Sequence, residues 1–124
     1  MVAAGIHVRG GSDAPVIHPD PINDIYFACN HPYDDTQSLS IHEALKLYTS
    51  EIAWTSFDEE GRGSLEEKKV ADMVLLNKNP LDLRREELRD LRVEALYLSG
   101  KPYKPGMSFA GMLFHSLTSG GIKI

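Results

Sequence analysis

The sequence predicts an α+β fold, in which helices and a small sheet occupy different parts of one chain. Three patterns lead to this class: a capped amphipathic segment at residues 41–54, strand-type segments at 70–76 and 91–97, and a short alternating segment at 6–9. Glycines and prolines separate these segments. A chain of 124 residues has the size of about one domain with a modest core.

The first segment alternates apolar and polar residues. Residues 6–9 read IHVR, which is typical of a short strand, and the glycine pair at 10–11 would end it. Asp13 would then lie just beyond the carboxyl end of that strand. Between residues 18 and 37, prolines and a polar run favour loop, with at most a short helix over 22–29.

The clearest helix signal is the stretch SLSIHEALKLYTSEIAW. Ser40 and Glu43 have the spacing of a capping box, which satisfies backbone donors that the first helical turn leaves unpaired. The apolar residues that share one helical face are Ile41, Ala44, Leu45, Tyr48 and Ile52. This pattern predicts one amphipathic helix over residues 41–54, with Leu45 in the core.

The second half of the chain predicts strands joined by short turns. Residues 70–76 are rich in β-favouring side chains, and the sequence RREELRD that follows favours a short helix. Residues 91–97 alternate again, and Ser99-Gly100 is placed to turn a hairpin. Pro102 would confine the returning strand to an edge of the sheet.

Composition and charge exclude several classes of partner. The net charge is −5, from 18 acidic and 13 basic residues, and no basic stripe is present that could follow phosphates, so we expect no nucleic-acid partner. No apolar stretch approaches the roughly 20 residues of a membrane-spanning helix, so we expect no membrane partner. Cys29 is the only cysteine and we expect it to be a small, partly buried residue. Without a signal-peptide pattern or a disulfide pair, we expect a cytoplasmic protein.

The order of three stretches resembles a known family. The stretches, in chain order, are AGI…GSDAPV, LSIHEALKLYTSEIAWTSFDEEGRGSLEEKKVADMVLLNKNPLD and VEALYLSGKPY. They are similar to the C-terminal part of the amidohydrolase superfamily, specifically its amidohydrolase family 3 branch. The resemblance covers residues 3 to about 104. In that family a metal-dependent (β/α)₈ barrel carries the active site, and segments from both ends of the chain form a small β-sandwich beside it.

The resemblance implies a division of residues 1–104 into two parts, and a tail that it does not cover follows them. Residues 1–56 would be a partial TIM-barrel end, with the last barrel strand and the helix after it. Residues 57–104 would belong to the composite β-sandwich subdomain. Residues 105–124 form an apolar tail, in which we expect a helix over 108–117.

The resemblance also suggests a role for Asp13. It matches the family's aspartate after the eighth barrel strand, which ligates a divalent metal and moves a proton between metal-bound water and the leaving group, so Asp13 is a candidate catalytic and metal-binding residue. Judged by its neighbours alone, an aspartate after Gly-Gly-Ser could instead cap a turn or the next helix. Both interpretations stay open at this point.

The other metal ligands that the family needs have no counterpart in this sequence. The five histidines, at positions 7, 18, 31, 42 and 115, contain no His-x-His pair, although His18 or His31 could approach Asp13 through the loop. A site with two ligands would hold zinc poorly. We therefore expect no cofactor in this chain alone, although the resemblance implies a divalent metal, zinc above all, in a full-length relative.

One position departs from the family pattern. Where the family usually has glycine, this chain has Lys68, so a turn that needs positive φ would be strained or remodelled.

These observations lead to two functional hypotheses. In the first, the chain is a C-terminal fragment or truncated relative of a metal-dependent amidohydrolase, which hydrolyses C–N bonds in amides or cyclic amides, and is inactive alone. A small amide substrate would then apply only to the full-length enzyme. In the second, the chain is a free-standing, non-catalytic assembly or binding module. In either case we expect a homo-oligomer, most simply a dimer, because the missing barrel would leave strand edges and apolar faces uncovered.

Overall fold

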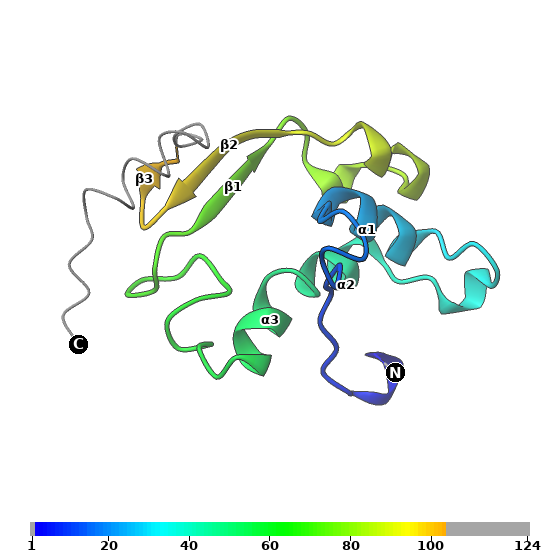
Figure 1. The fold of residues 1–124 in the computed structure, drawn as a ribbon, viewed down its shortest axis with the longest axis horizontal. Coiled ribbons are helices and arrows are strands. Elements are labelled where there is room, and N and C mark those ends of the chain that lie inside the picture. The colour runs from blue at the N-terminus through cyan, green and yellow to red at the C-terminus, as the bar shows by residue number, and fades with distance from the viewer. Residues whose placement is uncertain (1, 104–124) are drawn as a thin grey trace.

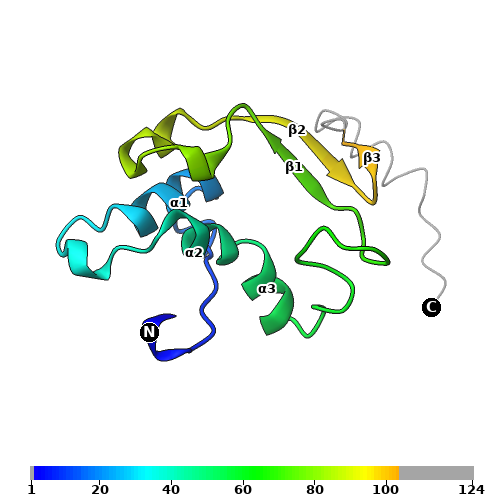
Figure 2. The same cartoon turned by 180° about the vertical axis from the view of Figure 1, so that it is seen from behind.

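The computed structural model describes residues 2–103 and confirms the α+β class. Helices gather in one part of the molecule and a three-stranded antiparallel sheet lies in the other (Figure 1). The view from behind shows the same arch, with the segment before the second strand running over the top from the helices to the sheet (Figure 2). The predicted tail helix over 108–117 lies outside the described residues. The predicted boundary between residues 56 and 57 stays a prediction.

The N-terminal segment is not the strand that the alternation predicts. After one 3₁₀ turn at Val2–Ala4, residues 6–9 run without any strand pairing. A strand requires a neighbour with which to exchange backbone hydrogen bonds, and no other strand lies beside this segment in the described part of the chain. Side-chain contacts to the helices hold it instead.

The predicted short helix before Cys29 is confirmed. Helix α1 spans Pro21–Cys29, with proline in its first turn, where the missing N–H costs nothing. The Asp20 side chain caps it by accepting a hydrogen bond of 3.2 Å from the backbone N–H of Asn23.

The capping box is confirmed, but the single helix over 41–54 is wrong. Helix α2 covers Ile41–Lys46 and helix α3 covers Ser50–Thr55, with a turn between them. Thr49 has φ −128° and ψ −96°, outside the helical region, and its hydroxyl donates to the carbonyl oxygen of Leu45 at 3.0 Å. Such a side-chain bond competes with helical hydrogen bonding and bends the chain.

The core lies where α1, α2 and the 3₁₀ segment Arg85–Asp90 meet. The buried residues of this cluster are Ile25, Cys29, Ala44, Leu88 and Leu91. Leu88 and Cys29 are the largest fully buried side chains, at 0% exposure. Leu45, which we expected in the core, is only half-buried and packs against it, because the fully buried position on α2 is taken by Ala44.

The sheet has the order β1-β2-β3, with β1 at Met73–Leu76, β2 at Val93–Leu98 and β3 at Lys101–Pro102. The predicted strand over 70–76 is therefore shorter than expected. The register places Met73 opposite Tyr97, and a bulge follows Leu75.

The predicted hairpin at Ser99-Gly100 is confirmed. Both turn residues have positive φ, 51° and 74°, as a type I′ turn requires. The turn is tied to the start of β1, because Gly100 N–H donates to the carbonyl oxygen of Ala71 at 2.8 Å and Ser99 N–H donates to Asp72 Oδ1 at 2.8 Å. Pro102 lies on an edge strand, as predicted.

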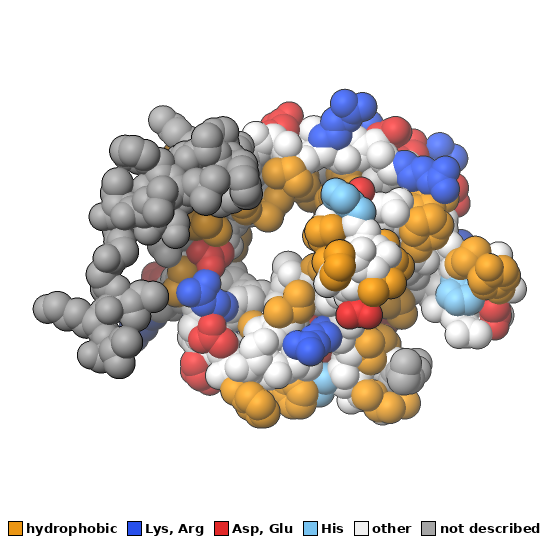
Figure 3. Space-filling view, in the orientation of Figure 1, with side chains coloured by type: hydrophobic (Ala, Val, Ile, Leu, Met, Phe, Trp, Pro, Cys, Tyr) orange, Lys and Arg blue, Asp and Glu red, His pale blue; other side chains and the backbone are white. Residues whose placement is uncertain are grey.

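Apolar side chains of the sheet remain exposed. Val74, Leu75, Val93 and Leu98 have exposed fractions between 46% and 55%. Hydrophobic side chains line an opening between the sheet and the helices (Figure 3). Residues 2–103 contain one sheet, so the sandwich arrangement stays a prediction.

The departure at Lys68 has the predicted consequence. Its φ is 75°, in the left-handed region that a side chain beyond glycine rarely adopts.

Candidate functional site

Asp13 lies in an exposed turn. Its φ is 52°, and the turn closes through a hydrogen bond of 3.0 Å from the backbone N–H of Val16 to the carbonyl oxygen of Asp13. The peptide bond between Ala14 and Pro15 is cis. Within the described residues, the Asp13 carboxylate makes no hydrogen bond or ion pair. The side chain is therefore free to meet a group from outside residues 2–103.

His31 is engaged in its own loop rather than with Asp13. Its Nδ1 accepts a hydrogen bond of 3.0 Å from the backbone N–H of Asp34, and the backbone N–H of His31 donates to the hydroxyl of Ser38 at 2.9 Å. His18 is exposed and has no hydrogen bond among the described side chains. These contacts give His31 a structural role.

No group of three His, Cys, Asp or Glu side chains in residues 2–103 could hold a metal ion. Zinc sites in enzymes use three protein ligands and keep a fourth position for water or substrate. Asp13 alone does not fit such a site. Any metal that it binds needs further ligands from outside the described residues.

The stretch that leads to Asp13 is anchored at Gly10. The backbone N–H of Gly10 donates to the carbonyl oxygen of Leu47 at 3.0 Å, and the ring of Tyr48 lies so close that a Cβ on Gly10 would overlap it. The hydroxyl of Tyr48 in turn donates to Asp24 Oδ2 of α1 at 2.9 Å. Burial and this hydrogen bond raise the pKa of Tyr48 to about 12. Gly10 is thus fixed to the turn between α2 and α3, which is itself fixed to α1.

A second contact of the N-terminal segment involves His7. Nδ1 of His7 lies 2.8 Å from Oε2 of Glu51 on α3, and the imidazole stacks on the ring of Trp54 with centroids 3.8 Å apart and an interplanar angle of 11°. Lys46 of α2 lies 3.7 Å from the other oxygen of Glu51. No pattern in the sequence pointed to this arrangement, because the alternation around His7 is also that of a strand.

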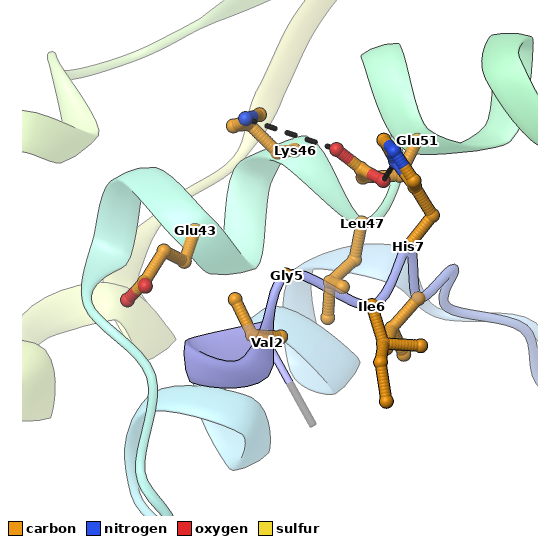
Figure 4. Close-up of a pocket in the computed structure, with 9 residues that line it drawn as sticks. Val2, Gly5, Ile6, His7, Glu43, Lys46, Leu47 and Glu51 are labelled. Carbon is orange, nitrogen blue, oxygen red and sulfur yellow. Dashed lines mark hydrogen bonds and ion pairs between the residues drawn. The ribbon is translucent and has the colours of Figure 1, made fainter.

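A small cavity opens between this segment and the helices. Its volume is about 190 Å³. Figure 4 shows the apolar side chains Val2, Ile6 and Leu47 along one side of this cavity and the contacts from Lys46 to Glu51 and from Glu51 to His7 along the other. The residues that define these two sides are Val2, Ile6, Leu47, His7, Lys46 and Glu51.

Cys29 lies in the buried core cluster. It is completely buried, more than the partial burial we expected, and burial raises the pKa of its thiol. Arg85 donates to the carbonyl oxygen of Cys29 at 3.2 Å and to Asp35 Oδ1 at 2.9 Å. This arginine ties the loop after α1 to the core.

The sequence profile of the amidohydrolase family matches residues 1–103. The chain belongs to the amidohydrolase family. The resemblance that the three quoted stretches suggested is thereby confirmed.

Two amidohydrolase-family relatives illustrate the similarity. The chain is 31% identical over 110 residues to YtcJ of Bacillus subtilis (strain 168), whose name assigns it to the amidohydrolases, and 30% identical over 106 residues to the N-substituted formamide deformylase of Arthrobacter pascens. These matches cover 82% and 81% of this chain. They cover only 21% and 20% of the relatives, so the chain spans about a fifth of their length.

A solved structure supports the fold. The crystal structure of an amidohydrolase from Thermotoga maritima MSB8 matches with a TM-score of 0.62 at 22% identity. The match covers 83% of this chain and 24% of the solved one. The α+β arrangement described above is therefore also part of an amidohydrolase structure.

No helix within residues 2–103 combines the length and apolar character needed to cross a membrane.

Proposed function

We propose that this chain corresponds to the C-terminal part of a metal-dependent amidohydrolase, which hydrolyses the C–N bond of an amide or cyclic amide, and that it is inactive alone. In this proposal residues 1–56 are the end of the catalytic barrel and residues 57–104 belong to its composite sandwich. Asp13 supplies one metal ligand and the group that moves a proton. The family match over residues 1–103 supports the assignment.

The observation that carries the proposal is the exposed, unpaired carboxylate of Asp13 among the described residues. Its carboxylate is exposed and unpaired among the described residues, while Gly10, three positions before it, is fixed to Leu47 and Tyr48. An anchored backbone that presents a free carboxylate is suited to a ligand that the rest of an active site must complete.

We expect the isolated chain to be inactive because it has too few protein ligands for a catalytic metal. One carboxylate does not give a catalytic metal its three protein ligands. The purified chain should therefore bind far less than one zinc per chain and should not hydrolyse N-substituted formamides or cyclic amides above background. Stoichiometric zinc, or turnover abolished by a chelator and by Asp13→Asn, would overturn this part.

The role of Asp13 can be tested in a relative that has a complete chain. Residues 10–16 of this protein would replace the aligned stretch of the Arthrobacter pascens deformylase. We expect the graft to hydrolyse N-substituted formamides and the same graft with Asp13→Asn to fall to background. A graft with Ser12→Ala controls for disturbance of the loop, and equal activity of the Asp13→Asn graft would refute the role.

Exposed apolar side chains on the sheet favour a second candidate function, that of an assembly module. Val74 and Leu75 are consecutive residues of β1 and point to opposite faces of the sheet, and both are about half exposed, so each face leaves apolar side chains uncovered. We propose that the isolated chain associates with a second copy through surfaces of this kind. Light scattering over a concentration series decides, because a constant mass of 13.8 kDa at high concentration would refute association.

A further inference from the structure

The N-terminal segment is held against the helices by few polar contacts. No strand pairs with residues 2–10, and the backbone bond from Gly10 to Leu47 lies at their far end. His7 makes the ion-pair contact of this segment, to Glu51 of α3, and the stacking contact, to Trp54 of α3. His7 therefore supplies the polar side-chain contact that joins residues 2–9 to α3.

Side chains of α2 and α3 provide the groups that face His7. From α3 they are Glu51 and the uncharged ring of Trp54, and from α2 it is Lys46. Glu43 of α2 lines the same cavity, but its carboxylate points away from His7 and accepts hydrogen bonds from Ser40 (Figure 4). The 3₁₀ turn Val2–Ala4 brings no titratable side chain. Lys46 contacts Oε1 of Glu51, while His7 contacts Oε2, so the two side chains do not compete for one oxygen.

Protonation of the imidazole strengthens both contacts of His7. Histidine changes charge between about pH 5 and about pH 8, depending on its surroundings. The protonated ring forms a charge-assisted bond to the Glu51 carboxylate and places a cation over the face of an indole, the aromatic ring that attracts cations best. The neutral ring keeps a weaker hydrogen bond and loses the cation.

We propose that His7 is a pH-sensitive positioning residue that docks the N-terminal segment onto α3, more tightly when its imidazole is protonated. Loss of the proton loosens residues 2–10, including the backbone bond from Gly10 to Leu47 at their end. The inference concerns the conformation of this chain and stands whether or not Asp13 binds a metal.

Trp54 is the only tryptophan and reports directly on the contact. A protonated imidazole quenches indole emission, so the fluorescence of the full chain should rise from about pH 5 to about pH 8. The rise should vanish in His7→Gln and persist in His42→Gln, which changes an exposed histidine of α2. Circular dichroism verifies that each variant keeps its fold. A rise of the same size in His7→Gln would overturn the proposal.

Trypsin provides a readout of docking that does not depend on tryptophan. The bond after Arg9 lies in the docked segment, whereas the bond after Lys78 lies in the loop that follows β1. The rate of cleavage after Arg9, divided by the rate after Lys78, should increase several-fold from about pH 6 to about pH 8 in the native chain. The ratio should change much less in His7→Gln and Glu51→Gln. A ratio independent of pH in the native chain, or equally dependent in His7→Gln, would refute the proposal.

Discussion

The backbone of Gly10 lies directly against the ring of Tyr48, with no space for a side chain between them. Gly10→Ala should therefore displace the ring and weaken the hydrogen bond that its hydroxyl donates to Asp24. We expect a loss of about 1–3 kcal/mol in the free energy of unfolding, the usual cost of overpacking. Urea denaturation of the two proteins measures the difference.

The neighbouring glycine is a matched control for this substitution. A Cβ on Gly11 would meet no atom within 4 Å, and Gly11 does not have positive φ. Gly11→Ala should change stability by less than Gly10→Ala. Equal losses in the two variants would mean that the Tyr48 contact is not what requires glycine.

Leu88 should be the most costly leucine to truncate. It is fully buried in the cluster that joins α1, α2 and the segment Arg85–Asp90. Leu88→Ala should cost about 2–5 kcal/mol, from lost burial and the cavity left behind. Leu81, which is 57% exposed, supplies the control, because Leu81→Ala removes the same atoms from a position that water already reaches. Denaturation midpoints that move equally would contradict this location of the core.

Lys68 offers a stabilising substitution. A non-glycine residue in the left-handed region costs roughly 1–2 kcal/mol, while glycine loses roughly 0.5–1 kcal/mol of chain entropy on folding. Lys68→Gly should therefore raise the melting temperature modestly. Glu67→Gly, at an exposed position without positive φ, should lower it. The expectation fails if both glycine variants melt below the parent chain.

Tyr48 should make stability depend on pH at the alkaline end. Because burial raises its folded-state pKa to about 12, above the ordinary tyrosine pKa of about 10, its contribution is full below the unfolded pKa and is lost as pH rises toward the folded pKa. Urea melts from about pH 8 to about pH 11 should show this decline in the parent chain and less of it in Tyr48→Phe. Tyr33, at 93% exposure, gives the control Tyr33→Phe, which should leave the decline unchanged.

Local patterns predicted the elements that local chemistry specifies. The Ser40–Glu43 capping box and the Ser99-Gly100 turn each depend on residues within a few positions of one another, and local residues were sufficient to predict them. The positive φ of Lys68 was expected from the family resemblance instead. For α1, the prolines favoured loop with at most a short helix, because the capping hydrogen bond of Asp20 was not recognised.

Features that depend on distant partners could not be predicted in this way. Residues 6–9 alternate like a strand, but alternation does not supply the neighbouring strand that pairing requires. The apolar face over 41–54 is continuous, yet the hydroxyl of Thr49 and the turn at Tyr48 divide it. In the candidate site, Asp13 was found through the family resemblance. The contact of His7 with Glu51 joins residues 44 positions apart, and neither segment carries a sequence pattern that predicts it.

The β1 and β3 edges of the sheet differ in chemistry, and the difference affects where a further strand can pair. The β3 edge carries Lys101 and Pro102, while the β1 edge reads MVLL, without charge or proline. A charged side chain and a ring that lacks an N–H both discourage a further strand, whereas an apolar edge accepts one. Among the described residues, we therefore expect a further strand to pair with the β1 edge in preference to the β3 edge.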